Sequence, residues 1–193
     1  MRTGMLCASL PLAALLVISP AVALAEETDT VQVSVVSGEL VTSVSVPRGM
    51  SAVILGIGSQ VSHGTATAWS VVDARGTGAG WTLSASVTNF VSAPGTSPGE
   101  LDVRVITADN LTITPGTVIS GDGADAAPHT GEIRMSTSSQ ALVSSPSGTT
   151  GAKGSFTVPA PVFSLTIPAN AFRSNVGDDG VHPYRSTIVF TIA

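Results

Sequence analysis

The stretch Val71–Phe90, VVDARGTGAGWTLSASVTNF, predicts a strand, a glycine-rich turn and a second strand. From Trp81 onward, apolar residues alternate with serines and threonines. The apolar set is Trp81, Leu83, Ala85 and Val87. Because successive side chains of a strand point to opposite faces, we expect this set to face a core and the hydroxyl-bearing set to face solvent.

The turn between these strands holds three glycines at alternate positions, Gly76, Gly78 and Gly80. Glycine adopts positive φ and lets two backbones approach closely, so the pattern predicts a tight and specific loop. Asp73 and Arg75 flank the loop at its start, and we expect an ion pair between them to brace it.

Asp73 also fits a catalytic acid assisted by Arg75. Glycoside hydrolysis requires two carboxylates facing each other across one bond, and the sequence places no second acid beside Asp73. The chain is rich in serine but has no Gly-x-Ser-x-Gly turn of the kind that presents a nucleophile. We therefore expect a structural pair, and neither catalytic residues nor a cofactor.

Trp81 has two interpretations. It fits a core residue beside the glycine turn, and it also fits an exposed platform that stacks on sugar rings. Its alternation with Leu83 favours burial. Trp69, Phe90 and Tyr184 are expected to pack in the core, and a buried Tyr184 hydroxyl would need a hydrogen-bond partner.

The rest of the chain predicts about ten short strands separated by turn signals, which is typical of a single-domain, mainly antiparallel, all-β sandwich. The expected strands are Val31–Val36, Val41–Val46, Ala66–Asp73, Leu101–Ile106, Leu111–Thr114, Ile133–Ser136, Ala141–Val143, Ser155–Val158, Phe163–Ile167 and Tyr184–Ile192.

Some of these expectations are specific enough to test. The first two strands would form a hairpin, Ala52–Leu55 would be buried, and Ser62–Gly64 would be a turn. In Leu101–Ile106, we expect Leu101, Val103 and Val105 to point inward, with Asp102 and Arg104 outward. Ser174–His182 would be a loop.

Residues 1–25 predict a secretory signal, with Arg2, the apolar run Met5–Ile18 and a small-residue cleavage site at Ala23–Ala25. The mature domain would then span residues 26–193 and carry seven basic and thirteen acidic side chains, a net charge of −6. Removal of the signal segment takes away Cys7, so we expect no disulfide and no cysteine-bound metal in the mature domain. No later run is long enough to span a membrane, and no basic cluster suggests nucleic-acid binding.

The segment Asp73-x-Arg75-Gly76-x-Gly78-x-Gly80-Trp81-x-Leu83, followed by Phe90, resembles the proximal motif of the WxL cell-surface domain. The segments Phe163–Ala171 and Tyr184–Ile192 resemble the part of that family that closes the domain. Its distal Trp-x-Leu is replaced here by Phe190-Thr191-Ile192, preceded by Tyr184. The resemblance implies a secreted protein attached non-covalently to the peptidoglycan of a Gram-positive cell wall, with the proximal motif important for that binding.

Metal sites have weaker signals. Asp122 with Asp125, and Asp178 with Asp179, supply oxygen ligands that suit Ca²⁺, but their spacing does not match an EF-hand loop. The histidines lie apart in expected loops, whereas a zinc site needs three or four converging ligands; they are His63, His129 and His182. We expect turns rather than a metal centre.

The resemblance to the WxL domain thus implies a cell-surface protein that binds peptidoglycan or another wall polymer, with other surface proteins as further partners. Two alternatives stay open. The domain could be a structural or adhesive envelope subunit that pairs strand edges with copies of itself or with host ligands. It could also be an enzyme on the same scaffold.

Overall fold

The computed structural model describes residues 31–148 and 153–193, so the predicted signal segment and its cleavage site lie outside the described residues. Residues from Val36 to Ala193 form one compact unit, separate from the residues before them. In the described part of the chain the regular structure is fifteen short strands and one 3₁₀ turn, η1 (Ala108–Asn110), without an α-helix. This confirms the all-β prediction.

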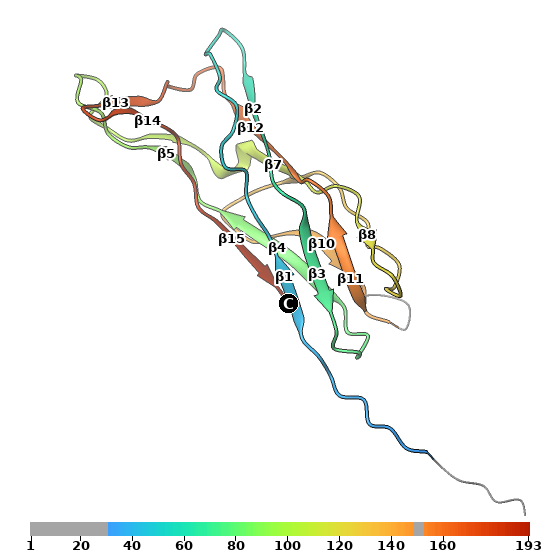
Figure 1. Cartoon of the computed structure of the whole chain (residues 1–193). Helices are drawn as coiled ribbons and strands as arrows, with labels where there is room; N and C mark the ends of the chain where they lie inside the picture. Colours follow the sequence, from blue (N-terminus) through green and yellow to red (C-terminus); the bar gives the residue numbers. More distant parts are fainter. Residues whose placement is uncertain (1–30, 149–152) are drawn as a thin grey trace, which may run out of the picture. The chain divides into compact units, whose positions relative to one another are not determined.

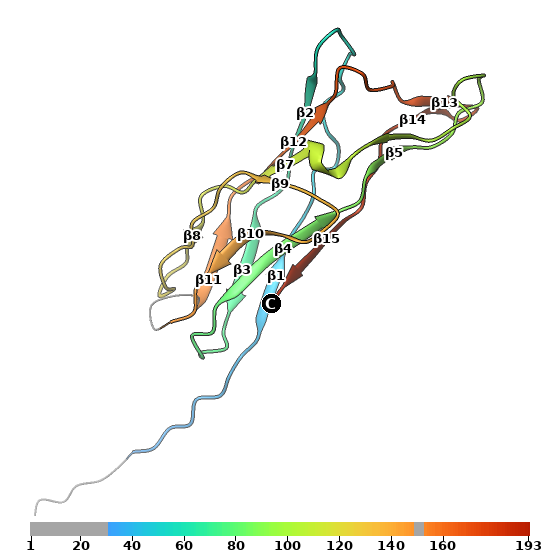
Figure 2. The same cartoon turned by 180° about the vertical axis from the view of Figure 1, so that it is seen from behind.

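Three antiparallel sheets carry most of the unit (Figures 1 and 2). The first has the order β1 (Leu40–Ser43), β3 (Trp69–Asp73), β11 (Gly154–Val158), β8 (Ile119–Ser120). The second is β10 (Gln140–Ser145), β4 (Trp81–Val87), β15 (Ile188–Ile192), and the third is β2 (Gln60–Thr65), β12 (Val162–Ile167), β7 (Leu111–Thr114), β9 (Ile133–Arg134). Two-stranded pairs join β5 (Phe90–Ser92) to β6 (Arg104–Ile106) and β13 (Asn175–Gly177) to β14 (Gly180–His182).

Aromatic side chains join the three sheets into one core. The ring of Trp81 on β4 lies 5.5 Å from that of Phe156 on β11. Trp69 on β3 makes edge contacts with Phe190 on β15 at 5.4 Å and with Phe163 on β12 at 6.3 Å. Both tryptophans are buried, so the sheets face one another in a sandwich-like arrangement.

The predicted strand and hairpin at residues 31–36 are wrong. No strand occurs between residues 31 and 39, and the valines at 31, 33, 35 and 36 are between 86% and 93% exposed. Strand β1 pairs with β3 instead, and the Gly38 N–H extends this contact by donating to the Ala74 carbonyl at 2.9 Å. The local pattern predicted that residues 31–36 pair with the strand that follows them. That strand, β1, pairs instead with β3, which is distant in sequence.

The predicted Ser62–Gly64 turn is also wrong, because these residues lie within β2. Ala52–Leu55 is not buried; it belongs to an irregular segment in which Ile54 is 92% exposed. The predicted Ser174–His182 loop contains the β13–β14 hairpin, which the buried Asn175 ties to the chain after β5 by donating its side-chain N–H to the Ala93 carbonyl at 2.9 Å.

The facing of Leu101–Ile106 differs from the prediction at Leu101, Val103, Arg104 and Val105, whereas Asp102 is exposed as predicted. Leu101, Val103 and Val105 are at least half exposed, and Ile106 is buried. The Arg104 guanidinium turns inward because it has two partners there. Its central carbon lies 5.1 Å from the centre of the Phe172 ring, and it donates to the Arg173 carbonyl at 2.7 Å. Hydrophobic periodicity cannot show such partners, which come from another part of the chain.

The closing segment keeps its predicted face but is a shorter strand than predicted. Residues 184, 186, 188, 190 and 192 are half-buried and the residues between them are exposed. Only Ile188–Ile192 forms β15, which pairs with β4, while Arg185 makes a separate bridge to Val91. The other strands that we predicted after residue 66 have counterparts in the structure; Leu111–Thr114 keeps its predicted bounds and the bounds of the rest are shifted.

Candidate functional site

The glycine-rich loop lies between the end of β3 at Asp73 and the start of β4 at Trp81. Arg75 donates from Nε and Nη2 to the two carboxylate oxygens of Asp73, at 3.0 and 2.9 Å. The same Nη2 donates to the carbonyls of Ala79 and Gly80, at 2.9 and 3.2 Å. The guanidinium thus ties both ends of the loop together, as the predicted brace requires.

The electrostatics of this pair are those of a structural contact. The hydrogen bond from Arg75 lowers the pKa of Asp73, although burial acts in the opposite direction. The Asp73 side chain is 1% exposed, and its two oxygens are occupied by Arg75. A general acid needs a raised pKa and access to substrate, so the geometry favours the structural interpretation.

The glycines of the loop are required by its geometry. Gly76 and Gly78 both have a φ of +69°, which favours glycine. A Cβ atom on Gly80 would lie 2.6 Å from the Ser145 carbonyl oxygen, and one on Gly78 would lie 2.7 Å from that of Gly148. The loop therefore packs its backbone directly against the segment that follows β10.

Trp81 is a core residue. It is 2% exposed and its ring contacts Phe156 in the facing sheet, so the interpretation as an exposed sugar platform is wrong. Leu83, the other apolar residue of the motif, is completely buried. The proximal motif therefore shapes the fold and presents none of its aromatic surface to a ligand.

The structure brings the proximal and distal motifs together on neighbouring strands. In the β4–β15 register, Ile192 is opposite Leu83 and Phe190 is opposite Ala85. Phe190 is half-buried against Trp69. Tyr184 lies before β15 and is half-buried, and its hydroxyl donates to the Phe172 carbonyl at 2.9 Å.

The structure also contains a large groove that the sequence analysis did not predict. The glycine loop precedes β4, whereas the groove lies beyond the C-terminal end of this strand. It has a volume of about 1090 Å³ and is lined by Pro47–Val53, Leu55, Ser62, Phe90, Ile106, Leu165, Ile167, Phe172–Ser174 and Pro183–Ser186. One signal was present in the sequence: the apolar run Ala52–Leu55 follows Pro47 and Gly49, which suits an exposed wall as well as a buried segment.

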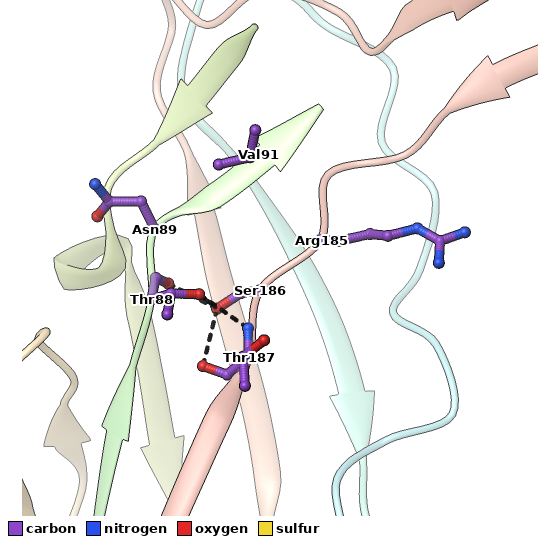
Figure 3. A pocket seen from close by; sticks show the side chains of 6 residues that line it. All are labelled: Thr88, Asn89, Val91, Arg185, Ser186 and Thr187. Atoms are coloured by element: carbon purple, nitrogen blue, oxygen red, sulfur yellow. Dashed lines mark hydrogen bonds between the residues drawn. The ribbon is translucent and has the colours of Figure 1, made fainter. Parts of the chain in front are cut away.

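A smaller hollow of about 510 Å³ adjoins the groove at Arg185 and is drawn in Figure 3. Its polar groups satisfy one another: Ser186 Oγ donates to the Thr88 carbonyl at 2.6 Å, and the Thr187 N–H donates to Thr88 Oγ1 at 2.9 Å. Figure 3 shows the Arg185 side chain directed away from these residues. The hollow thus offers few free polar groups, and its one cationic residue, Arg185, also lines the groove.

Two of the four carboxylates considered for Ca²⁺, Asp125 and Asp179, have protein partners. Asp125 pairs with Lys153 at 2.8 Å, and Asp179 accepts from His182 Nε2 at 2.7 Å. His63 Nδ1 lies 3.0 Å from Ser164 Oγ. Across residues 31–148 and 153–193, no three His, Cys, Asp or Glu side chains converge as a metal site, and no helix is long and apolar enough to cross a membrane.

Comparison with known proteins leaves the chain without an assigned relative. No protein-family model, no curated protein and no solved structure matches it. The resemblance to the WxL domain therefore depends on the motif residues alone.

Proposed function

We propose that this is an exported cell-surface protein that binds the peptidoglycan of a Gram-positive cell wall non-covalently through a WxL-like domain. The observation that carries the proposal is the construction of the proximal motif. Asp73, Arg75 and the three glycines form one braced loop, and it leads directly into the buried Trp81 and Leu83. A motif whose every position has a structural task supports the resemblance.

The position of the motifs indicates what they contribute. Their apolar residues on the β4–β15 pair belong to the core that holds the sheets together, so we expect the motifs to maintain a binding surface rather than to touch the polymer. A wall polymer repeats one unit many times, and several weak contacts made by clustered copies would retain the protein at the surface.

The test is co-sedimentation of the protein covering residues 26–193 with purified Gram-positive cell walls, at low and high salt. We expect pelleting that persists at high salt, because screening removes non-specific attraction between exposed charges. Walls digested with a muramidase serve as the control for an intact polymer. A protein that stays in the supernatant with every wall preparation would overturn the proposal.

A second function, a self-assembling or adhesive envelope subunit, is favoured by residues 31–36. This segment, VQVSVV, alternates like a strand and exposes its valines without a pairing partner. Such a segment can add to an open sheet edge of another molecule. Sedimentation velocity of the chains 26–193 and 37–193 over a range of concentrations tests this: assembly limited to the longer chain supports it, and two monomers refute it.

A further inference from the structure

The large groove has a preformed first wall. Residues 47–55 are held on strand β2, where Ser62 Oγ donates to the Ser51 carbonyl at 2.6 Å and the Ser51 N–H donates to the His63 carbonyl at 2.8 Å. The segment approaches the strand so closely that a Cβ on Gly64 would lie 2.9 Å from the Pro47 side chain. These contacts fix an irregular segment that has no regular hydrogen-bonding pattern of its own.

The opposite wall is anchored as well. Tyr184 donates its hydroxyl to the Phe172 carbonyl at 2.9 Å, which joins the chain before β15 to the chain after β12. Arg104 lies over the Phe172 ring and donates to the Arg173 carbonyl at 2.7 Å. Tyr184, a residue of the distal motif, thus contributes directly to the groove.

The floor of the groove is apolar. Phe90, Ile106 and Leu165 are buried there, and Met50 and Ile167 are half-buried beside them. Phe172, at the rim, is 67% exposed. A ligand that fills this space must bring apolar groups, because the burial of apolar surface supplies the binding free energy. A fully hydroxylated chain would bury its hydroxyl groups against apolar side chains without hydrogen-bond partners.

The charge of the groove is entirely positive. Its lining includes Arg48, Arg173 and Arg185 and no acidic residue, in a chain with thirteen acids and eight bases. Arg173 is paired with Glu100. Arg48 and Arg185 are exposed, and neither has an ion pair or a side-chain hydrogen bond within residues 31–148 and 153–193.

This absence of partners separates Arg48 and Arg185 from the other cations of the described chain. The other five each have a carboxylate partner: Arg75 with Asp73, Arg104 and Arg173 with Glu100, Arg134 with Asp109, and Lys153 with Asp125. With acids in excess, the only two arginine or lysine side chains of the described residues left unpaired line the same apolar groove. Their guanidinium groups match the geometry of a carboxylate.

We infer that this groove binds a short peptide that combines small apolar side chains with a free carboxylate, the carboxylate being held by Arg48 or Arg185. The choice of peptide rests on the proposed function, since wall polymers are cross-linked through short peptides, whereas the positive charge and apolar lining do not depend on it. A polyol phosphate would satisfy the arginines but leave the apolar floor without a partner.

The direct test is calorimetric titration of the 26–193 protein with N-acetyl-trialanine and with its C-terminal amide. We expect the free acid to bind at least tenfold more tightly than the amide. The double variant Arg48→Gln/Arg185→Gln should lose at least tenfold in affinity for the acid. The matched control is Arg134→Gln, which removes an exposed arginine outside the groove and should bind as the wild type does.

Both replaced arginines are exposed and unpaired, so the thermal unfolding midpoint of the double variant should equal that of the wild type. The inference is overturned if the amide binds as tightly as the acid, if the double variant keeps wild-type affinity, or if glycerol 3-phosphate binds more tightly than the peptide. No binding of the peptide by the wild-type protein overturns it too.

Co-sedimentation of the same proteins with walls separates the two proposals. If the wild type does not pellet, the proposed function fails even where the peptide binds. If the wild type and the double variant pellet equally, the function stands and the groove is not the wall-binding site. Loss of pelleting in the double variant alone, with Arg134→Gln unaffected, supports both.

Discussion

At the scale of single residues, Asp73 is the buried acceptor of the brace in the glycine loop. It accepts two hydrogen bonds from the Arg75 guanidinium and a third from the Arg75 backbone N–H, at 3.0 Å. Through Arg75 it also fixes the carbonyls of Ala79 and Gly80. Since Asp73 is buried, no water molecule can readily replace its partner if the pair is broken.

We expect Asp73→Asn to lower the free energy of unfolding by about 2 kcal/mol at neutral pH, the usual range for losing hydrogen bonds to a charged group. Urea unfolding followed by circular dichroism measures this. Asp122→Asn, which changes an exposed carboxylate in another loop, is the matched control and should leave stability unchanged. Equal stability of both variants and the wild type would contradict the brace.

The pH dependence of this effect follows from the lowered pKa of Asp73. Because the folded-state pKa lies below that of the unfolded chain, about 3.9, the stabilisation is present above that value. It is lost as the pH falls through the folded-state pKa. The stability difference between wild type and Asp73→Asn should therefore shrink in acid, and a difference that does not change with pH would contradict this assignment.

At the scale of elements, the β13–β14 hairpin carries its own charged contact across the turn. His182 Nε2 lies 2.7 Å from the Asp179 carboxylate, and this hydrogen bond raises the pKa of His182 and lowers that of Asp179. A raised histidine pKa means that the contact stabilises the hairpin at pH values below the unfolded-state pKa, about 6.5. The contribution is lost as the pH rises through the folded-state pKa.

We expect the His182 pKa, measured by NMR titration of the imidazole protons, to lie above about 6.5 and to decrease in Asp179→Asn. Amide exchange of β13 and β14 should become faster in the wild type as the pH rises through that pKa, beyond the intrinsic change in exchange rate. Asp178→Asn alters the neighbouring carboxylate and serves as the control. An identical His182 pKa in wild type and Asp179→Asn would refute the contact.

At the scale of the molecule, one core joins strands from all three sheets. Both tryptophans of the chain belong to this core. The Trp69 ring contacts Phe163 and Phe190, which lie in the two other sheets. The Trp69 indole N–H donates to the Ser45 carbonyl at 2.8 Å, which attaches the chain after β1 to this core. A core shared in this way favours cooperative unfolding.

We therefore expect tryptophan fluorescence and far-ultraviolet circular dichroism to report the same denaturation midpoint. Truncation to residues 37–193 should leave that midpoint unchanged, since residues before Val36 belong to a separate unit and Val36 itself is exposed. Two separate transitions would show that the sheets unfold independently and would contradict a single core.

Much of the local structure was predictable because its cause is local. The alternation in Trp81–Val87 and the glycines before it predicted a half-buried strand and a tight loop, and the structure contains both. The burial of Trp81 followed from its place in that alternation. The Asp73–Arg75 pair was predictable because its two members are two residues apart.

The sequence by itself determined the all-β class, the face of β4 and the braced glycine loop, because side-chain period and glycine conformational freedom act within a few residues. Only the tertiary structure decided which strands pair, where Arg104 points and which cations lack partners. Those outcomes depend on groups brought together from distant positions, as Val31–Val36 shows by lacking the partner that its pattern predicted. The groove likewise exists only because residues 47–55, 172–174 and 183–186 meet in space.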